Sequence, residues 1–329
     1  MSRLRICVAC QWTVPPSTYG GTDRVVDWLV RELVRRGHHV TLLAGSGSRS
    51  PATEIRVLDR DRPVAAQIPP DVDLAHLFAT PETPPEVPYL VSIGGHSAPS
   101  ESLDRNTVFV SADHASRYGS SCFVYNGLDP EDYGPVDWAR PREYLHFLAK
   151  AAWRVKNVRG AIAVARRAGQ RLVVMGGHRV NISMGPRLTL DPRVRFKGMV
   201  GGARKNRILN GSRALLFPVR WNEPFGLAIT ESLYFGCPVL GTPYGSLPEL
   251  VPDDVGVLSN RVSVLAEAAG NLERFDRHRC HEWVMDHFTS RQMTDGYLRL
   301  YQEVLDGRPL NAGPPRRLEQ GSALLGWED

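Results

Sequence analysis

The chain has 329 residues, 42% of them hydrophobic and 23% charged, an ordinary balance for a globular protein with room for two domains of about 150 residues. Its net charge of +5 permits an anionic partner, but the basic residues are spread along the chain and indicate no nucleic-acid-binding patch. No apolar run approaches the roughly 20 residues of a membrane span, and "MSRLRICVAC" lacks the features of a signal peptide. Five scattered cysteines (7, 10, 122, 237 and 280) form no disulfide framework, so we expect a cytoplasmic protein with at most peripheral contact at the inner face of the membrane.

The first half of the chain alternates apolar runs with helical or loop segments. A helix is expected in "TDRVVDWLVRELVRRG", where apolar residues recur at helical spacing. Strands are expected in "RICVAC", "HHVTLLAG", "TEIRVLD", "LAHLF", "YLVSIG", "TVFVSA" and "CFVYNG". Several of these are apolar throughout, which is typical of a parallel sheet covered on both faces.

The pattern restarts after the proline-bearing connection "GPVDWARPRE". Strands are expected in "YLHFLA", "RLVVMGG", "VRFKG", "ALLFPV" and "PVLGT", with helices near 157–168, 203–210 and 226–235. Two successive β-α-β series predict an α/β protein of two doubly wound, Rossmann-like domains facing each other across a cleft. We assign residues 1–138 to the first domain, 139–288 to the second, 289–306 to a helix packing back on the first, and 307–329 to a flexible tail.

Lysine is rare in this chain. Of its 40 basic residues, only Lys150, Lys156, Lys197 and Lys205 are lysines. Where arginine serves as the generic cation, a retained lysine is a candidate for a site that needs a compact ammonium.

The segment "NEPFGLAITESLYFGCPVLGTPYGS" places Glu223 before a predicted helix and Glu231 inside it. Pro224 and Gly226 allow a tight turn, after which the backbone N–H groups of Phe225, Gly226 and Leu227 can bind an anion at a helix N-terminus. Glu223 can then accept hydrogen bonds from hydroxyls, and Glu231 can hold the two hydroxyls of a ribose. A solvent-facing pair of glutamates is the alternative.

This segment resembles the signature of the retaining, nucleotide-sugar-dependent glycosyltransferases of family four, which have the GT-B fold. "PPSTYGGTDRVVDWLVRELVRRGHHVTLLA" resembles the N-terminal glycine loop and helix of that family, and "VYNGLDPEDY" resembles its Asn-Gly turn. "HEWVMDHFTSRQMTDGYLRLYQEVL" resembles its closing helical segment, so the likeness extends over most of the chain.

The resemblance implies that Glu223 holds the hydroxyls of the donor sugar and Glu231 the ribose. Lys150 and Lys156 would lie on the diphosphate, although arginine is commoner at position 150 and glycine usually follows the second lysine, where this chain has Asn157. The alternative is two surface lysines.

Other parts of the donor site are implied by the same resemblance. Gly20 and Gly21 would approach the β-phosphate and the acceptor, and Asn126 belongs to the nucleotide-binding set. His96, after a predicted strand, would be the pocket histidine, whereas His76 is expected to be structural.

Three motifs suggest metal sites that we do not expect. The Asp59/Asp61 and Asp71/Asp73 pairs match the Asp-x-Asp motif of the other major glycosyltransferase fold, but neither lies where this architecture handles phosphates. "CVAC" is a single pair within a strand, and the "HRCHEWVMDH" helix lacks the second histidine of a metalloprotease.

The sequence therefore predicts a bacterial-type retaining hexosyltransferase that moves a sugar from a UDP- or GDP-linked donor to an acceptor hydroxyl without a metal or other cofactor. The expected partners are the nucleotide sugar and a small-molecule, glycan or lipid-linked acceptor, with no nucleic acid, and the chain would be a monomer or homodimer. Two alternatives stay open: a non-catalytic sugar-nucleotide-binding protein and a sugar-nucleotide epimerase of the same fold.

Overall fold

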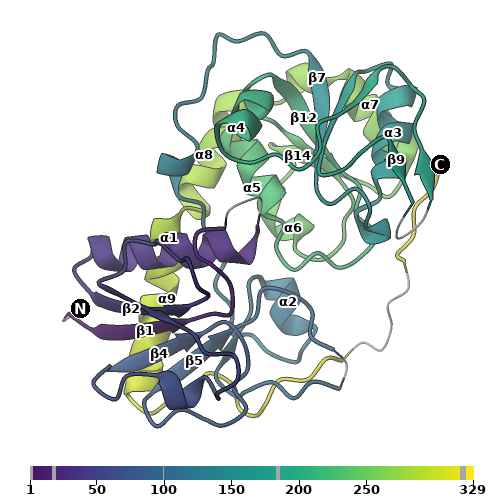
Figure 1. Cartoon of the computed structure of the whole chain (residues 1–329). Coiled ribbons are helices and arrows are strands. Elements are labelled where there is room, and N and C mark those ends of the chain that lie inside the picture. The colour runs from purple at the N-terminus through teal and green to yellow at the C-terminus, as the bar shows by residue number, and fades with distance from the viewer. Residues whose placement is uncertain (1–2, 17–19, 99, 183–185, 319–323) are drawn as a thin grey trace. The chain divides into compact units, whose positions relative to one another are not determined.

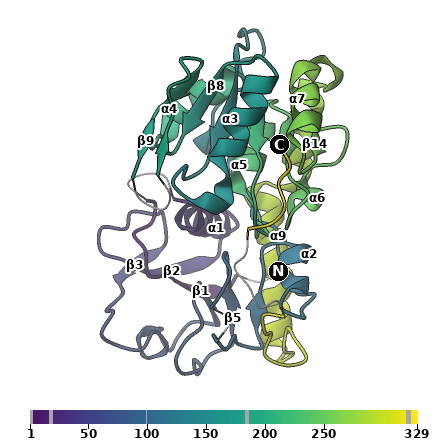
Figure 2. The ribbon, with the colours of Figure 1, turned by 90° about the vertical axis from the view of Figure 1, so that its right-hand side faces the viewer.

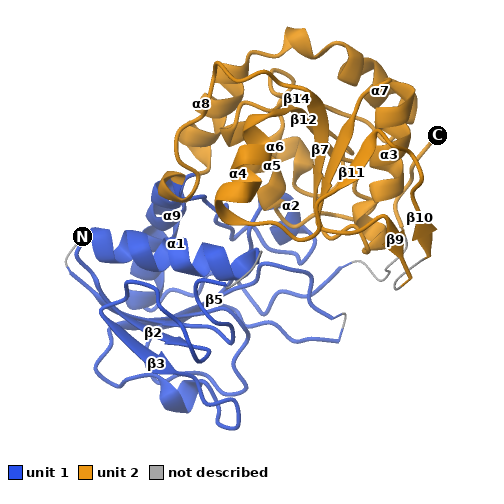
Figure 3. Ribbon diagram, turned by 45° about the horizontal axis from the view of Figure 1, so that its top comes forward, with its two compact units in different colours: residues 1–129, 289–320 blue, residues 130–288, 321–329 orange. Residues whose placement is uncertain are grey.

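The computed structural model describes residues 3–16, 20–98, 100–182, 186–318 and 324–329 (Figure 1). The chain divides into two compact units (Figure 3). Unit 1 comprises residues 1–129 and 289–320, and unit 2 comprises residues 130–288 and 321–329. The first boundary therefore follows Asp129, a few residues before the position assigned from the sequence. Within the described ranges no helix is long and apolar enough to cross a membrane.

Unit 1 is built on a parallel sheet of six strands among its described residues, in the order β3-β2-β1-β4-β5-β6. The strands are β1 (Arg5–Ala9), β2 (His39–Ala44), β3 (Glu54–Val57), β4 (Leu74–Leu77), β5 (Tyr89–Ser92) and β6 (Thr107–Val108). Its helices are α1 (Thr22–Arg35), α2 (Ala112–Ser116) and α9 (Ser290–Leu305), with short 3₁₀ turns elsewhere. The order reverses direction between β1 and β4, and such a switch point is where doubly wound folds bind ligands.

Helix α9 packs on α1 and β5 within unit 1. Met293, Tyr297, Tyr301 and Val304 form a stripe along α9 and are buried. His76 is fully buried beneath this stripe, with Nδ1 2.8 Å from the Tyr301 hydroxyl and Nε2 2.8 Å from the Ser92 hydroxyl. Burial lowers the pKa of His76 to about 3, so the ring is neutral and holds α9 to the sheet, in keeping with a structural role.

Unit 2 has a second parallel sheet, in the order β11-β8-β7-β12-β13-β14. Its strands are β7 (Tyr144–Leu148), β8 (Leu172–Met175), β11 (Val194–Phe196), β12 (Ser212–Phe217), β13 (Val239–Gly241) and β14 (Gly256–Leu258). A separate hairpin pairs β9 (Val180–Asn181) with β10 (Arg187–Leu188). The helices are α3 (Val158–Arg167), α4 (Gly202–Asn210), α5 (Leu227–Tyr234), α6 (Leu247–Leu250), α7 (Val262–Gly270) and α8 (Arg277–His287).

Alternation along β7 separates the two faces of this sheet. Leu145 and Phe147 point into the core formed with α3 and α7, which pack side by side (Figures 1 and 2). His146, between them, points to the other face, where its ring nitrogens lie 2.6 Å from the Ser212 hydroxyl and 2.8 Å from the Ser232 hydroxyl of α5. This contact fixes α5, the helix that carries Glu231, against the sheet.

Two expectations from the sequence are wrong. "CFVYNG" is not a strand, since Phe123 forms only an isolated bridge to Phe109 and the segment then turns toward α9. The tail is not loose in its described residues. Arg316 and Leu318 donate backbone hydrogen bonds to Tyr118 and Arg117 in unit 1, and Trp327 packs against the core of unit 2.

Candidate functional site

The segment that carries both glutamates joins β12 to α5 in unit 2. Gly226 precedes α5 with φ +88°, a left-handed conformation that favours glycine, and a Cβ there would lie 3.3 Å from Glu223 Cγ. The loop after β13 packs directly against the Glu223 backbone. A Cβ on Gly245 of that loop would lie only 2.2 Å from the Glu223 nitrogen, so the close approach requires glycine. Ser246 donates its N–H to the Glu223 carbonyl at 2.9 Å and its hydroxyl to the Phe225 carbonyl at 2.7 Å. The two glycine turns therefore fix the backbone of Glu223.

The Glu223 side chain is held by a lysine and a tryptophan. Lys156 Nζ lies 2.6 Å from Glu223 Oε2, and Trp221 Nε1 donates to the same oxygen at 2.7 Å. The Lys156 ammonium also lies 4.6 Å from the centre of the Trp221 ring. The side chains of Lys156 and Glu223 are only 12% and 8% exposed, so water screens this ion pair weakly. The structure thus brings together the residues predicted for the diphosphate and for the sugar.

Asn157 explains how the turn after Lys156 works without the expected glycine. Its φ and ψ are both 52°, and it is the only non-glycine residue of the described ranges with positive φ. Asparagine tolerates this conformation better than most residues, and its Oδ1 accepts the Gly160 N–H at 3.0 Å, which caps α3. Asn157 therefore adopts the left-handed turn at a position where glycine is usual.

Lys150 lies at the other end of this turn. It is exposed, and its ammonium lies 5.2 Å from the centre of the Trp153 ring. Within the described ranges it forms no ion pair, which leaves its charge available to an anion.

Glu231 has partners that the sequence did not suggest. Its side chain is fully buried, with Lys205 Nζ 2.5 Å from Oε1 and the Tyr133 hydroxyl donating to the same oxygen at 2.7 Å. Lys205 is itself 4% exposed and lies 4.9 Å from the centre of the Tyr133 ring. The solvent-facing glutamate considered as the alternative is excluded, because this carboxylate is part of a buried ionic cluster.

The remaining predicted residues belong to unit 1. Gly20 and Gly21 lead into α1, and the Gly20 carbonyl accepts a 2.6 Å hydrogen bond from Arg24 Nε. The loop after β5 comes close to this turn, because a Cβ on Gly94 would lie 3.3 Å from the Thr22 hydroxyl. His96 lies further along that loop.

The surroundings of His96 are aromatic. Its half-buried ring lies 5.2 Å from the ring of His114 and 6.5 Å from that of Tyr118. Burial, with a smaller effect of His96, lowers the pKa of His114 to about 3, so His114 is a neutral wall of this site. Asn126 is 9% exposed. The turn that contains it is held to the start of α9 by a backbone hydrogen bond of 2.7 Å, which Ser290 donates to the Leu128 carbonyl.

The part of unit 2 that contains these lysines and glutamates is similar to a known protein family. Residues 138–274, which hold Lys150, Lys156, Lys205, Glu223 and Glu231, match the family model described as glycosyl transferases group 1. Residues 138–274 form a group 1 glycosyltransferase domain.

The chain is also similar to individual proteins, in part of its sequence or in its fold. An uncharacterized 41.2 kDa protein in the cps region of Klebsiella pneumoniae is 31% identical over 99 residues, which is 27% of this chain and about a quarter (26%) of that protein. The crystal structure of AviGT4, a glycosyltransferase involved in avilamycin A biosynthesis, matches with a TM-score of 0.77 and 22% identity over 92% of this chain and 98% of that one. Anabaena Alr3699/HepE in complex with UDP and glucose matches with a TM-score of 0.64 and 13% identity over 91% and 100%. At these identities the structural likeness shows the fold, two parallel-sheet α/β units of GT-B type.

The motifs that resembled metal sites have other partners. Asp71 pairs with the Arg5 guanidinium, and Asp73 accepts the Arg5 N–H at 2.7 Å. Burial raises the pKa of Cys7 to about 12 and of Cys10 to about 11. His281 Nδ1 lies 2.5 Å from the Tyr234 carbonyl oxygen, which it binds. Among the described residues no group of three His, Cys, Asp or Glu side chains could hold a metal ion.

Sequence reasoning missed Lys205, Tyr133 and Trp221 in unit 2. The rarity of lysine singled out Lys205, but its position outside the expected diphosphate loop led to its being set aside. Tyr133 and Trp221 stand in no motif that the sequence analysis recognised. Tyr133 binds Glu231, 98 positions away, and Trp221 binds Glu223, two positions away, and only the structure shows these contacts.

Proposed function

We propose that this protein is a retaining glycosyltransferase that transfers a hexosyl group from a nucleoside-diphosphate sugar, UDP- or GDP-linked, to an acceptor hydroxyl without a metal. The observation that supports this most directly is the contact between Lys156 and Glu223. In such a donor the sugar C1 is bonded to a phosphate oxygen. The group that holds the sugar and the cation that holds the phosphate must therefore be neighbours, and here they lie 2.6 Å apart.

The ion pair positions both groups before the donor arrives. When a diphosphate binds, Lys156 and the exposed Lys150 supply positive charge to it, and the N-terminus of α5 adds its dipole. Glu223, still held by Trp221 Nε1, is then available to accept the hydroxyls of the sugar. These groups bind and orient the donor, so they stabilise charge where it develops.

The transfer step needs no protein nucleophile. The bond between the sugar C1 and the phosphate oxygen breaks, and the acceptor oxygen forms its bond to C1 on the same face. The leaving diphosphate takes the proton of the acceptor hydroxyl. Lys150 and Lys156 stabilise the negative charge on that diphosphate, and His96 of unit 1 is the proposed histidine beside the transferred sugar.

Glu231 is the proposed ribose ligand, but its carboxylate is buried and is not directly open to a ligand. Its carboxylate is fully buried against Lys205 and Tyr133, so a ribose reaches it only if a neighbouring side chain moves. Lys205 holds the carboxylate in place meanwhile. Gly20, Gly21 and Asn126 complete the proposed donor set from unit 1.

The test is calorimetric titration of UDP, GDP, ADP and TDP, and then of the corresponding nucleotide sugars. Wild-type protein is expected to bind at least one diphosphate and its sugar conjugate. Glu223→Gln should leave the affinity for the free diphosphate unchanged and abolish transfer, because the free diphosphate carries no sugar. Glu231→Ala should weaken the diphosphate and its sugar conjugate alike, by about 1–3 kcal/mol.

Each outcome separates the proposed roles. If Glu223→Gln weakens the free diphosphate as much as it lowers turnover, the assignment of Glu223 to the sugar is wrong. Binding without transfer would favour the non-catalytic alternative, and an isomerised sugar without acceptor would favour the epimerase. Circular dichroism melting of each variant verifies that it is folded at the temperature of the titration.

A further inference from the structure

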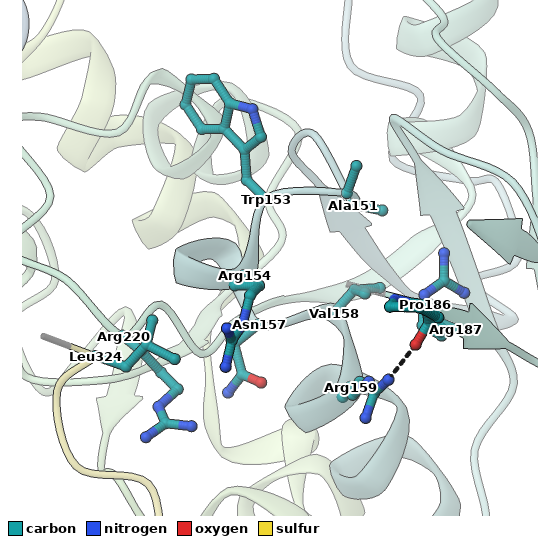
Figure 4. A pocket seen from close by; sticks show the side chains of 11 residues that line it. Ala151, Trp153, Arg154, Asn157, Val158, Arg159, Pro186, Arg187, Arg220 and Leu324 are labelled. Atoms are coloured by element: carbon teal, nitrogen blue, oxygen red, sulfur yellow. Dashed lines mark hydrogen bonds between the residues drawn. The ribbon is translucent and has the colours of Figure 1, made fainter. Parts of the chain in front are cut away.

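A cavity of about 420 Å³ opens in unit 2 at the start of α3 (Figure 4). Its walls come from the turn before α3, from α3 itself, from the β9–β10 hairpin, from the loop after β12 and from the C-terminal segment. Lys150, Lys156, Glu223 and Glu231 do not line it. The cavity shares the turn between Lys150 and Lys156 with the proposed donor site but is not lined by the side chains of that site, so a ligand bound in it need not take part in the transfer reaction.

The charged side chains that line this cavity are all arginines. They are Arg154, Arg159, Arg187 and Arg220. Among the described residues no carboxylate lines the cavity, and none of the four arginines forms an ion pair. Arg187 is only 9% exposed, and burial together with the nearby Arg159 lowers its pKa. The positive charge here is concentrated and is not balanced by the described part of the chain.

Three of these arginines are fixed in place by backbone carbonyls. Arg187 donates to the His178 carbonyl at 2.7 Å. Arg159 donates to the Pro186 carbonyl at 2.5 Å, drawn as the dashed line in Figure 4, and Arg220 Nε donates to the Leu325 carbonyl at 2.8 Å. Each keeps further N–H groups for a ligand, because a guanidinium has five donors. Arg154 is exposed at the rim.

Asn157 adds a buried donor. The residue is 9% exposed, and its Oδ1 faces the Gly160 N–H, which only an oxygen can accept. The amide Nδ2 is therefore left as a donor, and it is buried with no hydrogen-bond partner among the described residues. A buried donor without a partner is unfavourable, so an acceptor that reaches Asn157 Nδ2 lowers the free energy of the site.

The α3 helix strengthens the case for an anion. Asn157 is its N-cap and Val158 its first residue, and both line the cavity. A ten-residue helix carries partial positive charge at this end. The helix terminus, the unpaired Asn157 amide and the arginines converge on one space.

We propose that this cavity binds a phosphorylated small molecule. Its phosphate is bound by Asn157 Nδ2 and the guanidinium groups of Arg154 and Arg159 at the start of α3. Trp153 and Leu324 supply apolar wall for the remainder of the ligand. The volume is in the range of small-molecule sites, roughly 300–1,000 Å³.

Calorimetric titration with inorganic phosphate, at constant ionic strength set by chloride, tests the site. Asn157→Asp is the sharpest variant, because aspartate keeps the α3 cap but replaces the free donor with a negative oxygen. Arg154→Gln/Arg159→Gln removes two cations from the cavity. Arg167→Gln/Arg204→Gln is the matched control, since both of its arginines are exposed in unit 2 and neither lines the cavity.

With the proposed donor site saturated by the nucleoside diphosphate that binds best, wild-type protein should show saturable phosphate binding that Asn157→Asp abolishes. The Arg154/Arg159 variant should weaken it by roughly tenfold or more per arginine, the effect of losing one charge-assisted hydrogen bond. The control should bind as the wild type does, and all variants should retain the wild-type melting temperature within a few degrees. Equal binding by wild type and Asn157→Asp would overturn the proposal, as would an equal loss in the control variant.

Discussion

The buried pair of Lys205 and Glu231 yields a quantitative prediction. The Lys205 side chain is 4% exposed and that of Glu231 fully buried, and their charged atoms lie 2.5 Å apart. Lys205→Met removes the cation and leaves an uncompensated carboxylate in the interior. Breaking a buried pair in this way costs about 3–5 kcal/mol. For a unit of this size each kcal/mol corresponds to roughly 2–4 °C, so the melting temperature of unit 2 should fall by roughly 6–20 °C.

The assay is urea and thermal unfolding followed by circular dichroism. Lys197→Met is the matched control, because Lys197 is exposed and its replacement should change the free energy of unfolding by about 0.5 kcal/mol or less. The double variant Lys205→Met/Glu231→Gln should be more stable than Lys205→Met alone, since it no longer buries an unpaired charge. The reasoning fails if Lys205→Met unfolds like Lys197→Met. Lys205→Arg should also destabilise this site, because a guanidinium is larger than an ammonium.

Three further predictions concern the turn before α3, the C-terminal segment and the metal independence of transfer. Asn157→Gly should be more stable than Asn157→Ala by about 1–2 kcal/mol, the reverse of the usual helix order, because φ is +52° there; urea unfolding with alanine at least as stable would refute the left-handed turn. Trp327→Ala should cost on the order of 2 kcal/mol, below the roughly 3–5 kcal/mol of a fully buried tryptophan, and an unchanged unfolding midpoint would show that the C-terminal segment does not contribute to the core. Turnover should survive a strong chelator, since Lys150 and Lys156 supply the positive charge; complete loss that Mg²⁺ or Mn²⁺ restores would bring the Asp59/Asp61 pair back as a ligand candidate.

Much of the fold could be predicted because its strands and helices coincide with apolar runs and helical spacings in the sequence, and turns separate them. The strands from "RICVAC" to "PVLGT" and the α9 stripe are encoded by local periodicity, which parallel sheets preserve. "CFVYNG" has the composition of a strand but turns away after a single bridge at Phe123. The C-terminal segment has no periodic pattern, and its order comes from contacts such as that of Trp327 with the core, which composition does not show.

The candidate site divides in the same way. Glu223, Gly226 and Lys156 could be predicted, since each occupies a motif position whose spacing sets its geometry. Tyr133 could not, because its contact with Glu231 depends on how two segments 98 residues apart meet. Lys205 lies between these cases: its residue type suggested a site, but only the packing of α4 against α5 identifies its partner.

The most direct test of the central claim is the stereochemistry of transfer. An α-linked nucleotide sugar that the protein binds is incubated with a panel of hydroxyl acceptors, and the anomeric proton of the first product is followed by ¹H NMR. The proposed mechanism predicts an α-linked product formed together with one equivalent of nucleoside diphosphate. A first product with the β configuration would contradict it.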